Sequence, residues 1–422
     1  MTHSLSNLKD YVFIITYMKF IDCCSGIGGF HVAMSQLGGE CVWACDIDEK
    51  CRIVYEKNFN IKPEKDLTNL NIENIPDFDM LCAGFPCQPF SKAGFQLGFE
   101  DDRGNVFFAL CRIIKHHKPK FIVLENVKNI TSHDKGNTWK TIRYHINELG
   151  YHIQDKPIVL NALNFDVPQY RERVFMLCKM KDLGELPELN FEKVTLTKNI
   201  KDIIVNDEEN VKFKLKGKLK ITEQVWNNFL NICHSNSIDV PKFPIWTDWW
   251  DGNGEETSVT KFDKKLSKEE NEKNIKQKQK DFYEKYKNWI TKNREFYKHN
   301  KELLNPWLVN SRKNTLWKGA VRKFEWQAGN DKLSMNQVLW SPRGSGIRVK
   351  KLDYSPTLVA MASMIPVYGP ESRMLSPKEC MLLQNFPIDM VIDDDDYNAY
   401  KQAGNAVNVK IAKMCIKKLI QN

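Results

Sequence analysis

The stretch with the clearest chemical potential runs from Gly84 to Ser91, where a cysteine stands between two prolines. The preceding residues, Asp79 to Ala83, read as a short buried strand, and the glycine and prolines prevent its continuation. Cys87 is therefore expected on a stiff loop at the carboxyl end of a strand, where open α/β sheets place their chemistry. A positioned thiolate is a strong nucleophile at neutral pH. A lone cysteine is a weak catalytic signal by itself, so a buried structural thiol is the alternative interpretation.

Three charged residues lie in or directly after expected strands, and the first of them, Glu125, is expected to face the same crevice as Cys87. Glu125 directly follows the apolar run Phe121 to Leu124, which reads as another buried strand. Arg171 and Arg173 are two residues apart in a segment expected to be a strand, so they share one face. A carboxyl group can hold or transfer a proton, and fixed cations can stabilise charge that develops during a reaction.

A glycine-rich turn, Ser25 to Phe30, lies between an expected strand (18–24) and an expected helix (31–37). Such a turn lets backbone amides approach an anionic group. His31 stands where a dinucleotide fingerprint has its last glycine, so an ordinary tight turn remains an alternative. Asp46 ends the second strand about 20 residues after the glycines, where an acidic side chain can bind the hydroxyls of a ribose.

The same alternation of strands and helices continues to about residue 180. Helices are expected at 48–59, 105–117 and 138–149, and Asp66 falls at another strand end. The Asp66 carboxylate could accept a hydrogen bond from an adenine amino group, although helix capping is the alternative role. Alternating strands and helices predict a mostly parallel sheet with helices on both faces.

Composition limits the function classes. The chain has 422 residues, of which 42% are hydrophobic, enough to bury one enlarged core or two domains. The absence of a signal peptide and of any run of 18 apolar residues predicts a soluble intracellular protein without a membrane partner. Twelve cysteines without a CxxC pair or zinc-type histidine spacing indicate reduced thiols and no metal site. The net charge of +9 favours a polyanionic partner, although a lysine-rich genomic bias would give the same charge.

Taken in order, these motifs resemble those of the DNA (cytosine-5) methyltransferases of bacterial restriction-modification systems. The resemblance covers residues 18–180 and 340–422. Two positions depart from the family pattern: Cys24 stands where a phenylalanine is usual, and Ile47 where some members have tryptophan. Both aromatic side chains would pack on the cofactor, so a changed cofactor affinity is expected. The matching stretches are IDCCSGIGGF, the acid after the second strand, DLT, GFPCQPFS, ENV, QYRER, SPTL (355–358) and QAGNAV (402–407).

The resemblance implies a chemistry for the residues identified above. Cys87 would add to carbon 6 of a flipped-out cytosine, and Glu125 would hold ring nitrogen 3. Arg171 and Arg173 would hold the carbonyl oxygen and stabilise charge. S-adenosyl-L-methionine would donate the methyl group. The cofactor site would be lined by Asp22, Gly26, Gly28, Gly29, Asp46, Ile47, Asp66, Leu67, Pro86, Asn405 and Val407.

The resemblance also implies a partner and an organisation. Double-stranded DNA is the expected substrate of a monomeric enzyme of the bacterial cytoplasm, with a restriction endonuclease as its functional companion and no metal ion. The fold is expected to be α/β, a Rossmann-like S-adenosylmethionine-dependent methyltransferase sheet with helices on both faces, plus a smaller target-recognition domain. The expected segments are an N-terminal extension (1–17), a catalytic domain (18–195, completed by 395–422), the target-recognition domain (196–375) and a hinge (376–394).

The middle of the chain differs in character from its ends. Between about 196 and 340, lysine, asparagine and tryptophan interleave, and the strand–helix alternation stops. Residues 261–300 are expected to form a charged helix with aromatic residues at helical spacing. Those aromatics predict packing against a core, and contact with DNA is the alternative. Lysines would contact phosphates while a few side chains read base edges.

Three other function classes compete with this interpretation. A tRNA cytosine-5 methyltransferase of related fold would share the cysteine and ENV motifs, but the long middle segment favours DNA. A catalytically idle DNA-binding regulator would not need Cys87, Glu125, Arg171 and Arg173 together. A nicotinamide-dependent oxidoreductase could share the first strand–turn–helix unit, but the GFPCQPF stretch has no role in that chemistry.

Overall fold

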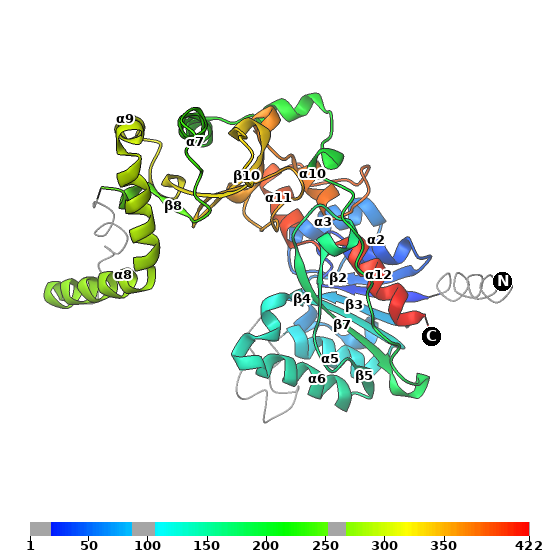
Figure 1. Cartoon of the computed structure of the whole chain (residues 1–422). Helices are drawn as coiled ribbons and strands as arrows, with labels where there is room; N and C mark the ends of the chain where they lie inside the picture. The colour runs from blue at the N-terminus through cyan, green and yellow to red at the C-terminus, as the bar shows by residue number, and fades with distance from the viewer. Residues whose placement is uncertain (1–17, 87–105, 252–266, 422) are drawn as a thin grey trace. The chain divides into compact units, whose positions relative to one another are not determined.

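The computed structural model describes residues 18–86, 106–251 and 267–421, and the chain divides into two compact units (Figure 1). Unit 1 contains the chain up to residue 205 together with 356–362 and 377–422, and unit 2 contains 206–355 and 363–376. Residues 196–205 therefore group with unit 1, because the Val205 amide donates to the Glu379 carboxylate at 3.0 Å. The segment that follows residue 376 also belongs to unit 1.

A seven-stranded sheet forms the centre of unit 1. The order is β2 (Glu40–Cys45), β1 (Lys19–Cys23), β3 (Met80–Gly84), β4 (Phe121–Val127), β7 (Glu172–Met180) and β5 (Tyr151–Ile153), with β6 (Ile158–Asn161) paired to β7. The first four of these strands are parallel, as expected, whereas β7 runs antiparallel to β4, β5 and β6. The reason is that β6 and β7 are joined by a short connection and not by a crossover α-helix.

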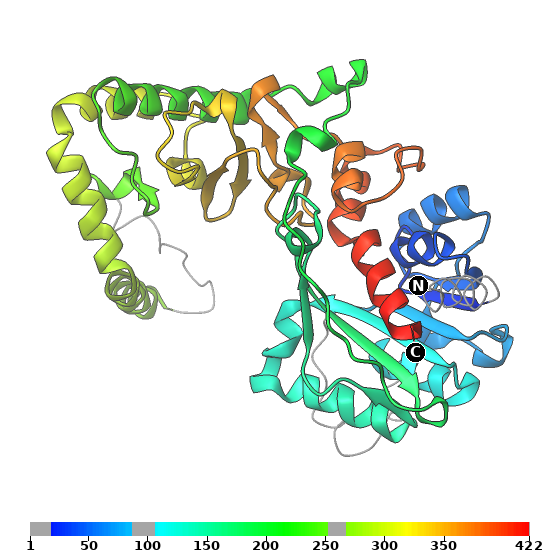
Figure 2. The same ribbon diagram turned by 45° about the vertical axis from the view of Figure 1, so that its right-hand side comes forward.

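Helices cover both faces of this sheet (Figures 1 and 2). Helices α2 (Gly29–Ser35) and α12 (Val409–Ile420) pack together on one face, and α5 (Val106–His117) and α6 (Asn137–Glu148) lie on the other. The apolar face of α5 contributes Phe107, Phe108 and Leu110 to the buried core. Burying these side chains removes apolar area from water, which is the main stabilising contribution.

The end of the chain returns to unit 1 through α10 (Pro377–Leu383), α11 (Asp396–Asn405) and α12. The Gln384 side chain donates to the carbonyl of Ala403 at 3.0 Å and ties the end of α10 to α11. The Asn408 side chain caps α12 by accepting from the amide of Ile411. These contacts hold the end of α11 and the start of α12, on either side of residues 406–408.

Unit 2 has a six-stranded sheet and a core rich in tryptophan. Trp226, Trp317 and Trp340 are fully buried there, and Trp226 stacks on Phe324 with ring centroids 4.3 Å apart. The strand order is β13 (Arg373–Met374), β12 (Val367–Tyr368), β10 (Leu339–Arg343), β11 (Gly346–Lys350), β9 (Lys323–Gln327) and β8 (Ile245–Trp246).

The helices of unit 2 are α7 (Gly217–Ser235), α8 (Lys268–His299) and α9 (Lys301–Arg312). The predicted charged helix is thus observed as α8. Its aromatic residues Phe282 and Tyr286 contact the rings of Trp246 and Trp249, so the predicted packing role is confirmed for these side chains. Within the described part of the chain, every helix is too short or too polar to span a membrane.

Candidate active site

The predicted site residues gather at the carboxyl edge of the parallel strands of unit 1. Cys23 of β1 is in register with Cys45 of β2, and Gly84 of β3 is in register with Glu125 of β4. The chain crosses from one side of β1 to the other between β2 and β3, so the strand order reverses at β1. Ligands of open α/β sheets bind at such a switch point.

Glu125 and Arg173 form a buried ion pair at this edge. The Arg173 Nε lies 3.1 Å from Glu125 Oε1, and the two side chains are only 17% and 10% exposed. Burial raises the pKa of Glu125 above its ordinary value, while the positive charges of Arg173 and Arg171 oppose that rise. The carboxyl group therefore holds its proton more readily than a solvent-exposed glutamic acid does, which suits a group that donates a proton.

Arg171 has different partners from Arg173. Its guanidinium is fully buried and donates to the carbonyl oxygens of Leu358, Gly404 and Ala406, at 2.7 Å for the last. Three carbonyls from two distant stretches of sequence thus converge on one cation. This geometry makes Arg171 a residue that positions the loop at 404–407, whereas its motif predicts that it stabilises charge on a substrate.

Cys87 and the residues that follow it up to 105 lie outside the described residues. The chain leading to Cys87 is held by Asn126, whose Nδ2 donates to the carbonyl of Phe85 at 2.9 Å. Phe85 is buried, and Pro86 is exposed as the last described residue before Cys87. A buried hydrogen bond from the end of β4 therefore fixes the position of Phe85, two residues before Cys87.

The glycine turn after β1 contacts the C-terminal return of the chain. Gly26 and Gly28 have φ angles of 53° and 89°, the left-handed region that favours glycine. A Cβ added to Gly29 would lie 2.5 Å from the carbonyl oxygen of Val407. A Cβ on Gly84 would lie 3.1 Å from the Val407 side chain and 3.8 Å from Glu125 Oε2. Val407 is therefore packed against both motifs, while the neighbouring Asn405 is exposed at the end of α11.

Replacing Gly29 with alanine is expected to lower the free energy of unfolding by about 1–3 kcal/mol, the cost of overpacking against a rigid group. The clashing atom belongs to the backbone of Val407 and cannot swing away. Gly39→Ala is the matched control, because its nearest atom is the flexible end of Met34. Urea unfolding of both variants tests this contact, and equal stability of the two would contradict it.

The carboxylate of Asp46 organises the turn beside the predicted cofactor site. It accepts from the amides of Gly26 at 2.7 Å and Asp48 at 2.8 Å. Each carboxylate oxygen keeps further lone pairs that could receive ribose hydroxyls. Burial raises the pKa of Asp46, and the hydrogen bonds from these two backbone amides oppose the rise. The side chain of the next residue, Ile47, is 68% exposed.

Asp66 and Asp22 differ in exposure. Asp66 accepts from the amide and hydroxyl of Thr68 and from Asn69, and these bonds lower the pKa of its carboxyl group. It therefore caps a short helix, as the alternative interpretation expected. Asp22 is fully buried, and burial raises the pKa of its carboxyl well above the ordinary value. Leu67 is a buried member of the unit 1 core.

Two further residues help to build this site, and neither has a role predicted from the sequence. Asn126 holds the backbone at Phe85, and the Thr357 hydroxyl donates to the carbonyl of Tyr170 at 2.6 Å. Asn126 belongs to the ENV motif and Thr357 to the SPTL motif. Their presence in these motifs was the only feature of the sequence that could have indicated a role. Among the described residues, no group of three or more histidine, cysteine, aspartate or glutamate side chains could hold a metal ion.

The sequence of this chain is similar to a protein-family profile and to several known methyltransferases. The profile of the family described as C-5 cytosine-specific DNA methylase matches residues 18–421. Type II methyltransferase M.HhaI of Haemophilus parahaemolyticus is 46% identical over 196 residues, which are 46% of this chain and 59% of that protein. M.DsaV of Dactylococcopsis salina is 38% identical over 215 residues, 51% of this chain and again 59% of the relative. The chain thus aligns with less than two thirds of these two relatives.

A third relative and one solved structure extend the likeness over almost the whole chain. Type II methyltransferase M.BanI of Aneurinibacillus aneurinilyticus is 32% identical over 445 residues, with 96% of both chains covered. A putative DNA modification methyltransferase from an E. coli prophage has the same fold, with a TM-score of 0.53, 20% identity and coverage of 96% of this chain and 98% of that one. The profile match and the M.BanI alignment together show that this chain belongs to the C-5 cytosine-specific DNA methylase family.

Proposed function

We propose that this chain methylates carbon 5 of a cytosine within a specific double-stranded DNA sequence. The observation that carries this proposal is the buried Glu125–Arg173 pair at the strand end beside Gly84. Cys87 is the third residue after Gly84, so a nucleophile and a proton-holding carboxyl are assigned to neighbouring strand ends. Family membership and the Type II relatives support the same reaction.

The residues present fit S-adenosyl-L-methionine at the β1 switch point. A Cβ on Gly26 would meet no atom of the described residues within 4 Å, so the backbone of the turn has room beside it for a ligand. Asp46 and Asp66 would hold the nucleoside part of the cofactor, and the exposed Ile47 side chain would cover the adenine. Gly28 and Gly29 would let the chain approach closely, with Val407 closing the site. When bound, the cofactor supplies an electrophilic methyl group.

The roles of the protein groups follow from the chemistry of cytosine. Carbon 5 is a poor nucleophile, so the Cys87 thiolate first forms a bond to carbon 6 and makes carbon 5 enamine-like. Glu125 donates a proton to ring nitrogen 3 as this bond forms, and Arg173 holds the Glu125 carboxyl in place. After carbon 5 gains the methyl group, water takes the proton of carbon 5, the bond to Cys87 breaks to release the thiolate, and nitrogen 3 returns its proton to Glu125. The target base must leave the duplex stack first, at a cost of a few kcal/mol.

The decisive experiment is expression of the chain in a bacterial host followed by bisulfite sequencing of host DNA. Protected cytosines in one recurrent sequence would support the proposal and would also reveal the recognition site. The transfer RNA of the same cells serves as the comparison. Methylated transfer RNA together with unmodified DNA would contradict the DNA assignment.

Cys24 provides a test of the predicted cofactor contact. Its side chain is partly buried against the unit 1 core, at a position where a phenylalanine ring would cover the adenosine. Its φ angle of 50° lies in the left-handed region, where cysteine already carries the steric cost of a Cβ atom. Cys24→Phe is expected to tighten S-adenosylmethionine binding by about 1 kcal/mol, the scale of one aromatic contact. Calorimetry measures this gain, with Cys24→Ala as the control that should show none.

A further inference from the structure

Helix α8 is anchored to unit 2 through one part of its length. Asn293 accepts from the amide of Trp246 at 2.8 Å and donates to the carbonyl of Pro244 at 3.0 Å. Ile290, Asn293 and Tyr297 are buried, and Phe282 packs near Trp249. These contacts fix the helix from about residue 282 to its end.

We name the N-terminal part of α8, residues 268–281, the α8 arm. Asn271 is its one buried residue, so most of its surface faces solvent. The arm begins with a capping box, in which Ser267 and Glu270 satisfy each other's backbone amides. A mostly polar helix gains little stability from burial, so the surface of the arm is available for contact with a partner.

The lysines of the arm are concentrated in its centre, where residues 273–280 include four lysines and no acidic residue, while the four acidic residues of the arm stand before and after this stretch. Between residues 273 and 292 the helix carries seven lysines and two acidic residues. Six of the seven form two rows with a seven-residue repeat, which corresponds to about 10.5 Å along a helix and returns to nearly the same side. The first row is Lys273, Lys280 and Lys287, and the second is Lys278, Lys285 and Lys292.

The less exposed side of the helix separates the two rows. Ile275, Gln279, Phe282 and Tyr286 lie along this side at helical spacing. The contacts of Phe282 and Tyr286 with unit 2 therefore fix which side of the helix each row of lysines occupies.

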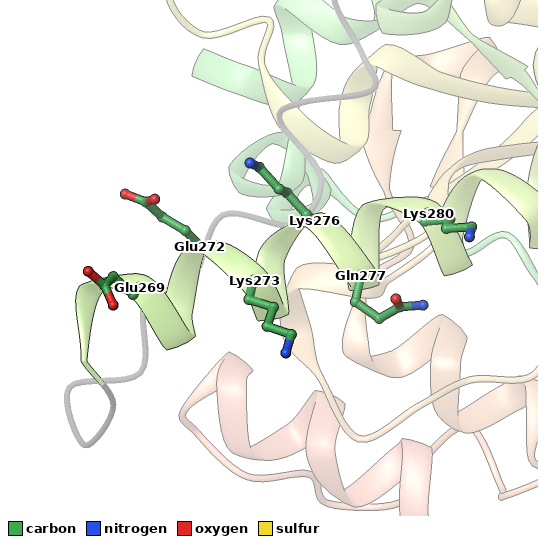
Figure 3. A pocket seen from close by; sticks show the side chains of 6 residues that line it. All are labelled: Glu269, Glu272, Lys273, Lys276, Gln277 and Lys280. Carbon is green, nitrogen blue, oxygen red and sulfur yellow. The ribbon is translucent and has the colours of Figure 1, made fainter.

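The lysines of the arm make no neutralising contacts that the structure describes. Lys273, Lys276, Lys278 and Lys280 are exposed and form no ion pair with another described residue. Figure 3 shows Lys273, Lys276 and Lys280 projecting from successive turns of α8, after Glu269 and Glu272 at its start. These glutamates complement the positive end of the helix dipole and leave the lysine charge beyond them uncompensated.

We propose that the α8 arm binds the phosphate backbone of duplex DNA independently of base sequence. This inference rests on the proposed function and adds a binding surface to it. Lysine supplies a compact charge on a flexible stem, which suits phosphate contacts and carries no base specificity. Duplex DNA presents one negative charge per about 1.7 Å of its axis, so Lys273 and Lys280 of the arm, about 10.5 Å apart along the helix, can each contact a phosphate.

The test replaces Lys273, Lys276, Lys278 and Lys280 with glutamine, which keeps helix propensity and removes four charges. The control replaces four exposed lysines of unit 1, Lys62, Lys140, Lys156 and Lys193, in the same way. The full-length proteins are titrated with a duplex of mixed sequence, long enough to span both units, at several salt concentrations. Circular dichroism checks that both variants keep their helix content.

The arm variant is expected to bind the duplex about tenfold more weakly at low salt, and the control about as tightly as the original chain. The slope of log K against log salt should fall by about 0.9 for each phosphate that the arm no longer neutralises. Equal weakening in both variants, or unchanged binding in the arm variant, would overturn the proposal. Stronger competition by transfer RNA than by duplex would overturn it as well.

A second readout separates this inference from the proposed function. Methyl transfer to plasmid DNA is measured for all three proteins. If the original chain methylates plasmid DNA and the arm variant binds the duplex normally, DNA binding by the α8 arm is refuted and the proposed methyltransferase function is supported. A chain that binds the duplex through the arm but methylates no plasmid refutes the proposed function alone.

Discussion

Replacing Cys87 with alanine is expected to abolish methyl transfer, with a loss on the order of 10⁴-fold or more, the scale seen when a catalytic nucleophile is removed. Water cannot replace the thiolate at carbon 6, so carbon 5 stays unreactive. Binding of DNA and of S-adenosylmethionine should survive, because neither depends on a covalent bond. Incorporation of labelled methyl groups into plasmid DNA measures the loss.

A covalent trap provides the complementary result. DNA containing 5-fluorocytosine should remain attached to the original chain, because fluorine cannot leave carbon 5 as a proton does. Mass spectrometry should place the adduct on Cys87. Cys51→Ala is the matched control: burial raises the pKa of the Cys51 thiol, which therefore stays protonated and unreactive. Turnover by Cys87→Ala, or an adduct on another cysteine, would refute the covalent route.

Glu125→Gln is expected to lower the rate of methyl transfer by about 10² to 10⁴-fold, the usual contribution of a positioned general acid. The affinity for DNA should change far less, since the proton is needed chiefly in the transition state. Glutamine keeps the size of the side chain but cannot deliver a proton. Single-turnover kinetics with saturating DNA separates the two effects.

The pH dependence of the methyl-transfer rate tests whether Glu125 acts in its protonated form. Because burial raises the pKa of Glu125, the acid form persists to higher pH than in a free glutamic acid. The rate should therefore decline as pH rises through the pKa in the folded protein, and Glu125→Gln should lack this decline. Glu172→Gln is the control, since Glu172 pairs with Lys128 at 2.9 Å and is the more exposed carboxylate. Similar losses from both substitutions would assign Glu125 a structural role.

For the two arginines, the sequence motif predicted the position beside Glu125 but did not predict all the contacts that they make. Their spacing of two placed both beside Glu125, and both charges do act on its pKa. Spacing could not show that the guanidinium of Arg171 is taken up by three carbonyls. Two of these carbonyls belong to residues more than 230 positions away in sequence. Only the folded chain brings them to one cation.

The sequence by itself determined the alternation of strands and helices in unit 1, because apolar periodicity, glycine turns and caps act over a few neighbouring residues. It also indicated the family, through ordered motifs whose chemistry depends on residue type. The prediction of α8 followed in the same way from its aromatic spacing, while the pairing partners Trp246 and Trp249 did not.

The tertiary structure decided what depends on distant contacts. The antiparallel half of the sheet, the grouping of 196–205 with unit 1 and the packing of Val407 on Gly29 and Gly84 all arise between segments far apart in sequence. Local propensity carries no information on such pairings, because register and burial are settled by the whole core at once. For the same reason Asn126 acquired its role only when the carbonyl of Phe85 came within 2.9 Å of its amide.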